Sequence, residues 1–304
     1  MSNQSELIKQ LRASTQAGFM DCKKALDACN NDLEAAVKWL RENGIAKAAK
    51  KVDNVAAEGI ISLHVEGNKG LLLEVNSQTD FVTKNDKFLA FINELTKAIF
   101  MGDFKTLDEA KNAKLASGKT VTEQEIELTA TIGEKISLRR FAFVTAKADE
   151  VIGSYLHANK RIGVLLALKQ TDTETSKHLA MHVAASNPKF ISEQHVDKKW
   201  LDGEKEVILA QVEGDETVAE KLKKVNDETK KADLKNKIIE GRIHKLLAES
   251  CLDSQVYLID STKKVGQFLK EKSLTVNEMI RYEVGEGIEK KVTDFAEEVR
   301  SQMK

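Results

Sequence analysis

The chain has 304 residues, 41% of them hydrophobic, which is enough for two or three modules with buried cores. Its 47 basic and 48 acidic side chains nearly cancel, so composition argues against a protein that binds nucleic acid directly or a membrane surface through bulk charge. No apolar stretch approaches the roughly 18 residues of a membrane span, the start lacks the order of a secretory signal, and the three cysteines form no CxxC pair, so we expect a cytoplasmic protein.

Three short helices are predicted in the first 44 residues, because apolar side chains recur there at helical spacing. The third is expected to be capped by Asn31 and to end at Gly44. Residues 45–57 are small and lysine-rich, which is typical of a tether. We therefore expect a small three-helix domain followed by a linker.

A β-hairpin is predicted from Glu58 onward, where the hydrophobic period changes to two on either side of Gly67-Asn68-Lys69-Gly70. After Asp86 an apolar stripe predicts a helix; it consists of Phe88, Phe91, Ile92, Leu95 and Ile99. A further helix is expected to open at a capping box over residues 122–125 and to close at Gly133, before a β-prone segment at 136–146.

The same plan recurs 92 to 94 residues later, which favours an internal duplication. The matching pairs are Gly59 and Gly153, Gly70 and Gly163, Leu72 and Leu165, Leu73 and Leu166, Thr79 and Thr171, and Asp80 and Asp172. After the shared Thr-Asp the copies differ, because the first continues with Phe81 and the second with Thr173. A loop made only for packing should have kept an apolar residue in both copies.

A charged helical segment follows Pro188. Its later part predicts a coiled-coil seam at Val218, Leu222, Val225, Thr229, Ala232, Asn236, Ile239, Ile243 and Leu246. A weaker early helix is marked by Val196, Trp200, Val207 and Ala210. Gly214-Asp215 is the expected tip of an antiparallel hairpin, whose polar surface suits self-association or contact with a partner. Strands are then expected at 255–260 and 275–284.

The predicted fold class is α+β. The expected domains are a three-helix bundle (1–54), core repeat 1 (55–147), core repeat 2 (148–189 and 250–285), an inserted antiparallel coiled-coil hairpin (190–249) and a C-terminal helical module (286–304). The last helix, about 287 to 303, would carry Ile288, Val292, Phe295, Ala296 and Val299 on one face.

The strongest candidate for a binding site is the loop after the second predicted strand, in the sequence LLLEVNSQTDFV (71–82). It places the aromatic ring of Phe81 beside Asp80, and loops carry binding groups on rigid scaffolds. The alternative is that Phe81 folds back as a hydrophobic plug under the next helix.

Catalytic, nucleotide-binding and metal-binding motifs are not evident in the sequence. The chain lacks GxxxxGK, GxGxxG, HExxH and GxSxG motifs, and we predict no cofactor and no metal. His178 and His182 are four residues apart and could share a metal, but ordinary helix histidines are favoured. Cys22 and Cys29 are interpreted as packing residues. A basic run at Lys47, Lys50 and Lys51 could touch nucleic acid, and a solvated tether is favoured.

Two separated signatures resemble those of bacterial elongation factor Ts, the family of guanine nucleotide exchange factors for elongation factor Tu. The first is Leu11-Arg12, Thr15 and the run GFMDCKKAL (18–26), and the second is TDFV (79–82). The resemblance implies an N-terminal module similar to the ubiquitin-associated fold. It also implies a duplicated core, and elongation factor Tu, GDP-bound or nucleotide-free, as the partner.

The resemblance further implies which residues meet the partner. They are Thr79, Asp80, Phe81 and Val82 beside the partner's magnesium and phosphate site; Arg12, Phe19, Met20 and Lys23 in the bundle; Ile132 and Gly133 before a strand; and His157, Leu258 and Ile259 toward a more distant partner domain. Phe19 and Met20 could instead belong to the bundle's own core. Thr83 and longer segments at 103–121 and 190–250 depart from the family pattern, and the longer arm leaves a homodimer open.

Two other functions compete with exchange. One is an adaptor whose bundle and coiled coil scaffold other proteins, in which case Phe81 could be replaced without loss. The other is a metal-dependent hydrolase built on His178 and His182. Neither explains the N-terminal signature and the TDFV loop together.

Overall fold

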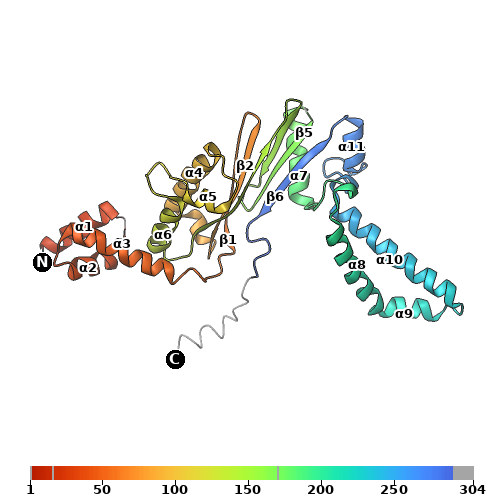
Figure 1. Ribbon diagram of the computed structural model, residues 1–304, viewed down its shortest axis with the longest axis horizontal. Helices are drawn as coiled ribbons and strands as arrows, with labels where there is room; N and C mark the ends of the chain where they lie inside the picture. Colours follow the sequence, from red (N-terminus) through yellow and green to blue (C-terminus); the bar gives the residue numbers. More distant parts are fainter. Residues whose placement is uncertain (1, 16, 170, 290–304) are drawn as a thin grey trace.

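A computed structural model describes residues 2–15, 17–169 and 171–289 of the chain (Figure 1). The molecule is elongated: a helical bundle lies at one end, a helical arm at the other, and two β-sheets with their helices lie between them. The mixture of helices with antiparallel sheets confirms the predicted α+β class.

The N-terminal bundle consists of α1 (Ser2–Thr15), α2 (Phe19–Ala28) and α3 (Leu33–Ala49) around a small core. The predicted cap at Asn31 is wrong, because Asp32 accepts the hydrogen bond from the Ala35 amide (3.0 Å). Asn31 instead takes a left-handed φ of 63° in the preceding turn.

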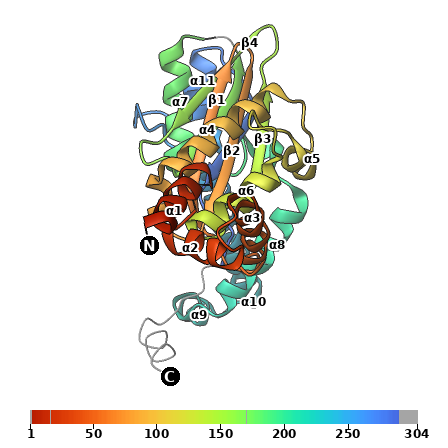
Figure 2. The same ribbon diagram turned by 90° about the vertical axis from the view of Figure 1, so that its left-hand side faces the viewer.

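Gly44 was expected to end α3, and that expectation is also wrong, since the helix continues for five more residues to Ala49. The glycine serves close packing instead: a Cβ at this position would lie 3.2 Å from the Ala130 Cβ. Figures 1 and 2 show α3 leading from the bundle to the base of the first sheet, where it meets α6 (Val121–Ile132). Part of the predicted tether is therefore a rigid helical connection.

Two three-stranded antiparallel sheets form the centre. They are β1-β2-β3 (Glu58–Glu66, Lys69–Ser77, Ser137–Thr145) and β4-β5-β6 (Glu150–Leu156, Ile162–Lys169, Val276–Glu283). The predicted hairpin is confirmed as β1 and β2. Both sheets have the same strand order, and their register shifts, at Glu74/Val75 and Ala167/Leu168, lie 93 residues apart. This offset agrees with the sequence repeat.

The sheets pack face to face, and helices cover their outer faces. Leu72 of β2 and Leu165 of β5 belong to the cluster between the sheets, whereas Leu71 and Leu73 point into the outer core with α4 (Asp86–Met101). Successive strand residues point to opposite faces, so β2 is apolar without alternation because both faces are buried. The outer face of the second sheet is covered by α7 (Thr173–Ser186).

Two equivalent glycines allow the sheets to approach. A Cβ at Gly70 would lie 2.9 Å from the Leu165 Cδ2, and one at Gly163 would lie 2.7 Å from the Leu72 Cδ1 and 2.6 Å from the Ile61 Cγ2. Each sheet therefore needs a glycine where the other sheet presents a leucine.

Replacing Gly163 by alanine is expected to destabilise the paired sheets by about 1 to 3 kcal/mol, the usual cost of overpacking a buried contact. Urea denaturation followed by far-ultraviolet circular dichroism would measure it. Gly203→Ala is the matched control, because a Cβ there meets nothing within 4 Å. Unchanged stability of the Gly163 variant would show that the sheets are not tightly packed at this point.

The remaining elements of the core are short. They are η1 (Phe81–Lys84), α5 (Leu107–Asn112), η2 (Glu193–His195), η3 (Leu252–Ser254) and α11 (Val265–Glu271). The predicted stripe of α4 is buried, as expected. The capping box of α6 is Thr120 with Glu123, not the expected segment 122–125. The strand expected at 255–260 is absent from that segment, which forms a loop with one isolated bridge between Val256 and Lys264.

The helical arm contains α8 (Lys198–Glu213), α9 (Glu216–Lys223) and α10 (Glu228–Ser250). The seam predicted from Val218 to Leu246 does not run along one continuous helix, because the chain breaks between α9 and α10. Five of its residues do pack in the arm's core: Val218, Leu222, Ile239, Ile243 and Leu246. Residues Ile208 and Val212 of α8 pack in the arm's core, while the expected Val207 is 51% exposed. Gly214-Asp215 joins α8 to α9, and the chain reverses at residues 224–227 instead.

Two further expectations concerned a C-terminal helix and the absence of a membrane span. The predicted helix at 287–303 lies outside the described residues from residue 290 onward. Within the described part of the chain, no helix is long and apolar enough to span a bilayer.

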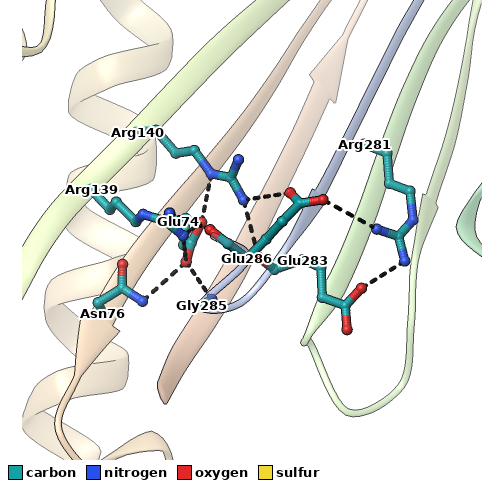
Figure 3. A network of polar contacts seen from close by, with 8 residues as sticks. All are labelled: Glu74, Asn76, Arg139, Arg140, Arg281, Glu283, Gly285 and Glu286. Carbon is teal, nitrogen blue, oxygen red and sulfur yellow. Dashed lines mark hydrogen bonds and ion pairs between the residues drawn. The ribbon is translucent and has the colours of Figure 1, made fainter. Parts of the chain in front are cut away.

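A buried carboxylate joins the two halves of the core (Figure 3). Glu74 of β2 is fully buried and contacts Arg139 (3.0 Å) and Arg140 (2.6 Å) of β3. It also accepts a hydrogen bond from the amide of Gly285, just beyond β6 (2.8 Å). The Arg140 guanidinium also forms an ion pair with the Glu286 carboxylate (3.1 Å). The end of β6 is therefore attached to the first sheet by charged hydrogen bonds as well as by apolar packing.

Candidate functional site

The loop between β2 and α4, residues 78–85, has a fixed backbone; we call it the TDFV loop. The Ser77 hydroxyl donates to the Thr79 carbonyl (2.8 Å), and the Thr83 hydroxyl donates to the Asp80 carbonyl (2.6 Å). One 3-10 turn, η1, follows, and the Asn85 side chain then caps α4 at the Lys87 amide (3.0 Å). Local hydrogen bonds therefore fix the backbone of the loop between the sheet and α4.

Neighbouring side chains of the loop point in opposite directions. Val82 is 4% exposed and packs in the outer core of the first sheet with Phe88, whereas the ring of Phe81 is 80% exposed. The plug interpretation of Phe81 is therefore wrong. Val82 was predicted to contact a partner, but its buried side chain holds the loop on the core instead. An exposed ring on an anchored loop is a group available for binding.

The end of α6 lies beside the TDFV loop. Gly133 ends the helix with a left-handed φ of 86°, and the partly buried Ile132 packs against the outer core of the first sheet. The next residue, Glu134, accepts hydrogen bonds from both the amide and the hydroxyl of Thr79. The predicted contact residues Ile132 and Gly133 are thus adjacent in space to Thr79.

The N-terminal bundle presents a second exposed face. Phe19 and Met20, at the start of α2, are 51% and 59% exposed, and Lys23 one turn later is exposed too. The bundle's own core takes Cys22, Ala25 and Leu26 from α2 and does not include the exposed Phe19 and Met20, so assigning those two residues to that core is wrong. Their exposed face combines apolar, thioether and cationic groups, as at adaptable protein contacts.

Arg12 lies between the bundle and the core. A shallow hollow is lined by Arg12 and Lys9 of α1 and by Lys87 in the first turn of α4. Because α4 directly follows the TDFV loop, this hollow places the exposed Arg12 on the side of the molecule that carries Phe81. The excess of basic groups suits an acidic partner surface.

His157 lies at the same end of the sheets as the TDFV loop. Ser77, at the end of β2, pairs with Glu58 at the start of β1. Glu58 forms an ion pair with Arg161, which lies in the turn between β4 and β5 with the exposed His157. The two halves of the duplicated core therefore present their candidate residues toward one side.

The loop after η3 carries the last predicted pair. Leu258 and Ile259 are 55% and 47% exposed, and the amide of Leu258 donates to Nδ1 of the buried His182 (3.1 Å). Arg281, which pairs with Val164 near the start of β5, reaches the Ala184 carbonyl near the end of α7 (3.2 Å). This loop thus lies near the end of the second sheet that is next to the β4–β5 turn.

His182 has a structural role. Its Nε2 lies 3.0 Å from the Gln255 Oε1, and its Nδ1 accepts the Leu258 amide, so both ring nitrogens are used within the protein. Burial lowers the pKa of His182, which keeps the ring neutral. His178 instead lies near Glu174 on the helix surface. Among the described residues there is no cluster of three or more potential metal ligands.

The cysteines are packing residues in a chemically quiet setting. Cys22 and Cys251 are buried and Cys29 is half-buried, and all three are free thiols. Burial raises the pKa of Cys251 to about 11, so its thiol stays protonated and unreactive at neutral pH.

The family model described as Elongation factor TS matches residues 78–286. The chain is 52% identical over 305 residues to Elongation factor Ts of Mycoplasmoides gallisepticum, 46% over 307 to that of Mycoplasma pneumoniae and 44% over 306 to that of Malacoplasma penetrans. Each alignment covers 100% of both sequences.

Proposed function

Because the chain belongs to the elongation factor Ts family, we propose that it binds elongation factor Tu and promotes the release of GDP, so that GTP can rebind. The reaction takes place in the cytoplasm, without a cofactor and without an acid or base of this chain. The chain acts by binding alone, and its effect is to lower the partner's affinity for the nucleotide.

The exposed ring of Phe81 is the observation that carries this proposal. It is 80% exposed on a loop whose neighbour Val82 is buried, so the ring projects from a fixed base. We propose that Asp80 and Phe81 enter the partner's nucleotide-binding domain and wedge beside its magnesium and phosphate site. Several charge-assisted contacts hold a β-phosphate there, and a small displacement weakens them together.

Contacts on either side of the TDFV loop would hold the wedge in place. We assign docking on the same partner domain to Arg12, Phe19, Met20 and Lys23, with Ile132 and Gly133 beside the loop. His157, Leu258 and Ile259 would reach a more distant partner domain. The support is their exposure, or their position at the loop, on one side of the molecule.

Dissociation of the chain from its partner follows from the reciprocal coupling between nucleotide binding and chain binding. If the bound chain weakens nucleotide binding by some factor, nucleotide weakens binding of the chain by the same factor. A complex with the empty partner therefore forms, and either GDP or GTP dissolves it. The chain does not choose which nucleotide returns.

The helical arm is assigned no part in exchange. Its suggested homodimer stays a prediction; Val207 and Leu209 of α8 are 51% and 40% exposed and could form such a contact. Sedimentation velocity of the full chain would decide it, and a monomer at micromolar concentration would end the suggestion.

Stopped-flow release of a fluorescent GDP from elongation factor Tu is the direct test. We expect the chain to accelerate release strongly in a saturable manner, and added unlabelled GDP to dissociate the complex because the coupling is reciprocal. A chain that binds elongation factor Tu without accelerating release would favour the adaptor interpretation instead.

A further inference from the structure

Glu134 makes a two-point contact with the residue before Asp80. Its Oε2 accepts the Thr79 amide (2.8 Å), and its Oε1 accepts the Thr79 hydroxyl (2.7 Å). The position of Glu134 is itself set by the left-handed Gly133, which ends α6 immediately before it. One carboxylate from a helix end thus fixes both the backbone and the side chain of Thr79.

The next residue pair repeats the arrangement. The Lys135 amide donates to the Gln78 Oε1 (2.8 Å), and the Asn54 side chain donates to the same oxygen (3.2 Å). The Lys135 ammonium bonds the Asn54 carbonyl (3.2 Å). Two consecutive residues after α6 therefore hold the first two residues of the TDFV loop, and they connect it to the segment that leads to the N-terminal bundle.

The second repeat shows why the first needs this support. There the Thr-Asp pair leads directly into α7, and Asp172 is the helix cap, with its carboxylate on the Thr175 amide (2.8 Å). In the first repeat η1 is inserted, so α4 is capped by Asn85 rather than by Asp80. The insertion releases Thr79 and Asp80 from the helix, and Glu134 supplies the contact that the cap no longer provides.

We propose that Glu134 is a positioning residue for nucleotide exchange: its carboxylate holds Thr79 so that Phe81 is presented in one orientation before the partner arrives. The inference rests on the exchange function proposed above and adds a residue outside the predicted contact set. Without this contact the loop loses its anchor to α6, and the ring must be ordered during the encounter, which costs conformational entropy.

Three variants test the proposal: Glu134→Ala, Glu134→Gln and the control Glu109→Gln. Glu109 also accepts two backbone amides, those of Lys105 (2.7 Å) and Thr106 (3.2 Å), at the start of α5. The control therefore removes the same charge from a similar contact away from the TDFV loop. The rate of GDP release at saturating chain and the half-saturating concentration are measured for each, with wild type in parallel.

We expect Glu134→Ala to lower the saturating release rate about tenfold, the effect of losing charge-assisted hydrogen bonds, with a smaller change in the half-saturating concentration because the bundle still docks. Glu134→Gln should retain an intermediate rate, since its carbonyl oxygen can accept the Thr79 amide. Amide hydrogen exchange of Thr79 in the free chain, read from threonine-selective nitrogen-15 spectra, should accelerate in the alanine variant and stay protected in Glu109→Gln.

Any of three results overturns the proposal. The first is unchanged Thr79 protection in Glu134→Ala, and the second is lost protection with a release rate at the wild-type value. The third is an equal loss of rate in Glu109→Gln, which would assign the effect to general destabilisation. Failure of the exchange function itself is distinguished by wild type, because the unmodified chain would then not accelerate release at all.

Discussion

Truncation of Phe81 to alanine is expected to lower the chain's acceleration of GDP release from elongation factor Tu by about 30-fold, because a hot-spot aromatic contributes about 2 kcal/mol or more to binding. Its ring makes almost no contact within the free chain, being 80% exposed. The stability of the free chain should therefore change by less than about 0.5 kcal/mol. A large functional loss with an unchanged fold is the signature of a group that acts on a partner.

The matched control is Met101→Ala. Met101 is 83% exposed at the far end of α4, so this change removes a similarly exposed, large apolar side chain at a position away from the TDFV loop. Its release rate should equal that of wild type. If Phe81→Ala also kept the wild-type rate, the wedge would be wrong, and the N-terminal face would have to carry exchange.

The sheets could be predicted because their signals are local. Alternation and a glycine turn predicted the hairpin of β1 and β2, and the 93-residue repeat predicted a second copy. The helical stripe predicted α4 for the same reason. Burial on both faces of β2 was less apparent, since continuous apolar runs arise in strands and in buried helices alike.

Both ends of α3 were predicted wrongly, because the residues at each end suit more than one structural role. Asn31 and Asp32 are both good caps, and only the left-handed turn at Asn31 decides for Asp32. Gly44 has the composition of a helix stop, but contact with Ala130 gives the glycine another purpose. Such choices depend on tertiary packing, which sequence spacing does not contain.

The candidate site was found in part. The break from an apolar strand into a polar loop with one aromatic indicated Phe81, but the buried direction of Val82 could not be read from adjacent letters. Glu134 was missed because its partner Thr79 is 55 residues away in sequence. An available signal was an acidic residue directly after the helix-ending Gly133, where its orientation is well defined.

Replacing Glu74 by alanine is expected to destabilise the attachment of β6 to the first sheet by about 3 kcal/mol, the cost of removing one member of a buried charge pair. The carboxylate is fully buried, and the substitution would leave Arg139, Arg140 and the Gly285 amide without their shared acceptor. The expected result is local opening, measured as faster amide hydrogen exchange in β6 and β2. Exchange in the distant helical arm should not change.

The pH dependence gives the same contact a second signature. Burial raises the pKa of Glu74, but the Gly285 amide and the two arginines lower it more, so the net pKa lies below its usual value. The stabilisation is therefore fully present above the unfolded-state pKa of about 4.3, and it is lost as the pH falls through the lower folded-state pKa. Glu74→Gln, which cannot titrate, should lack this component of acid destabilisation.

Glu286→Gln separates the buried carboxylate from its exposed neighbour. Glu286 also contacts Arg140 (3.1 Å), but its side chain is 42% exposed, and such an ion pair contributes less than about 1 kcal/mol. Its hydrogen exchange in β6 should remain close to wild type at neutral pH. Equal effects of Glu286→Gln and Glu74→Ala would show that the network acts through surface charge. A large effect confined to Glu74 would show that one buried acceptor, contacting β3 and the end of β6, holds the two sheets in the relative position that places His157 at the same end of the sheets as the TDFV loop.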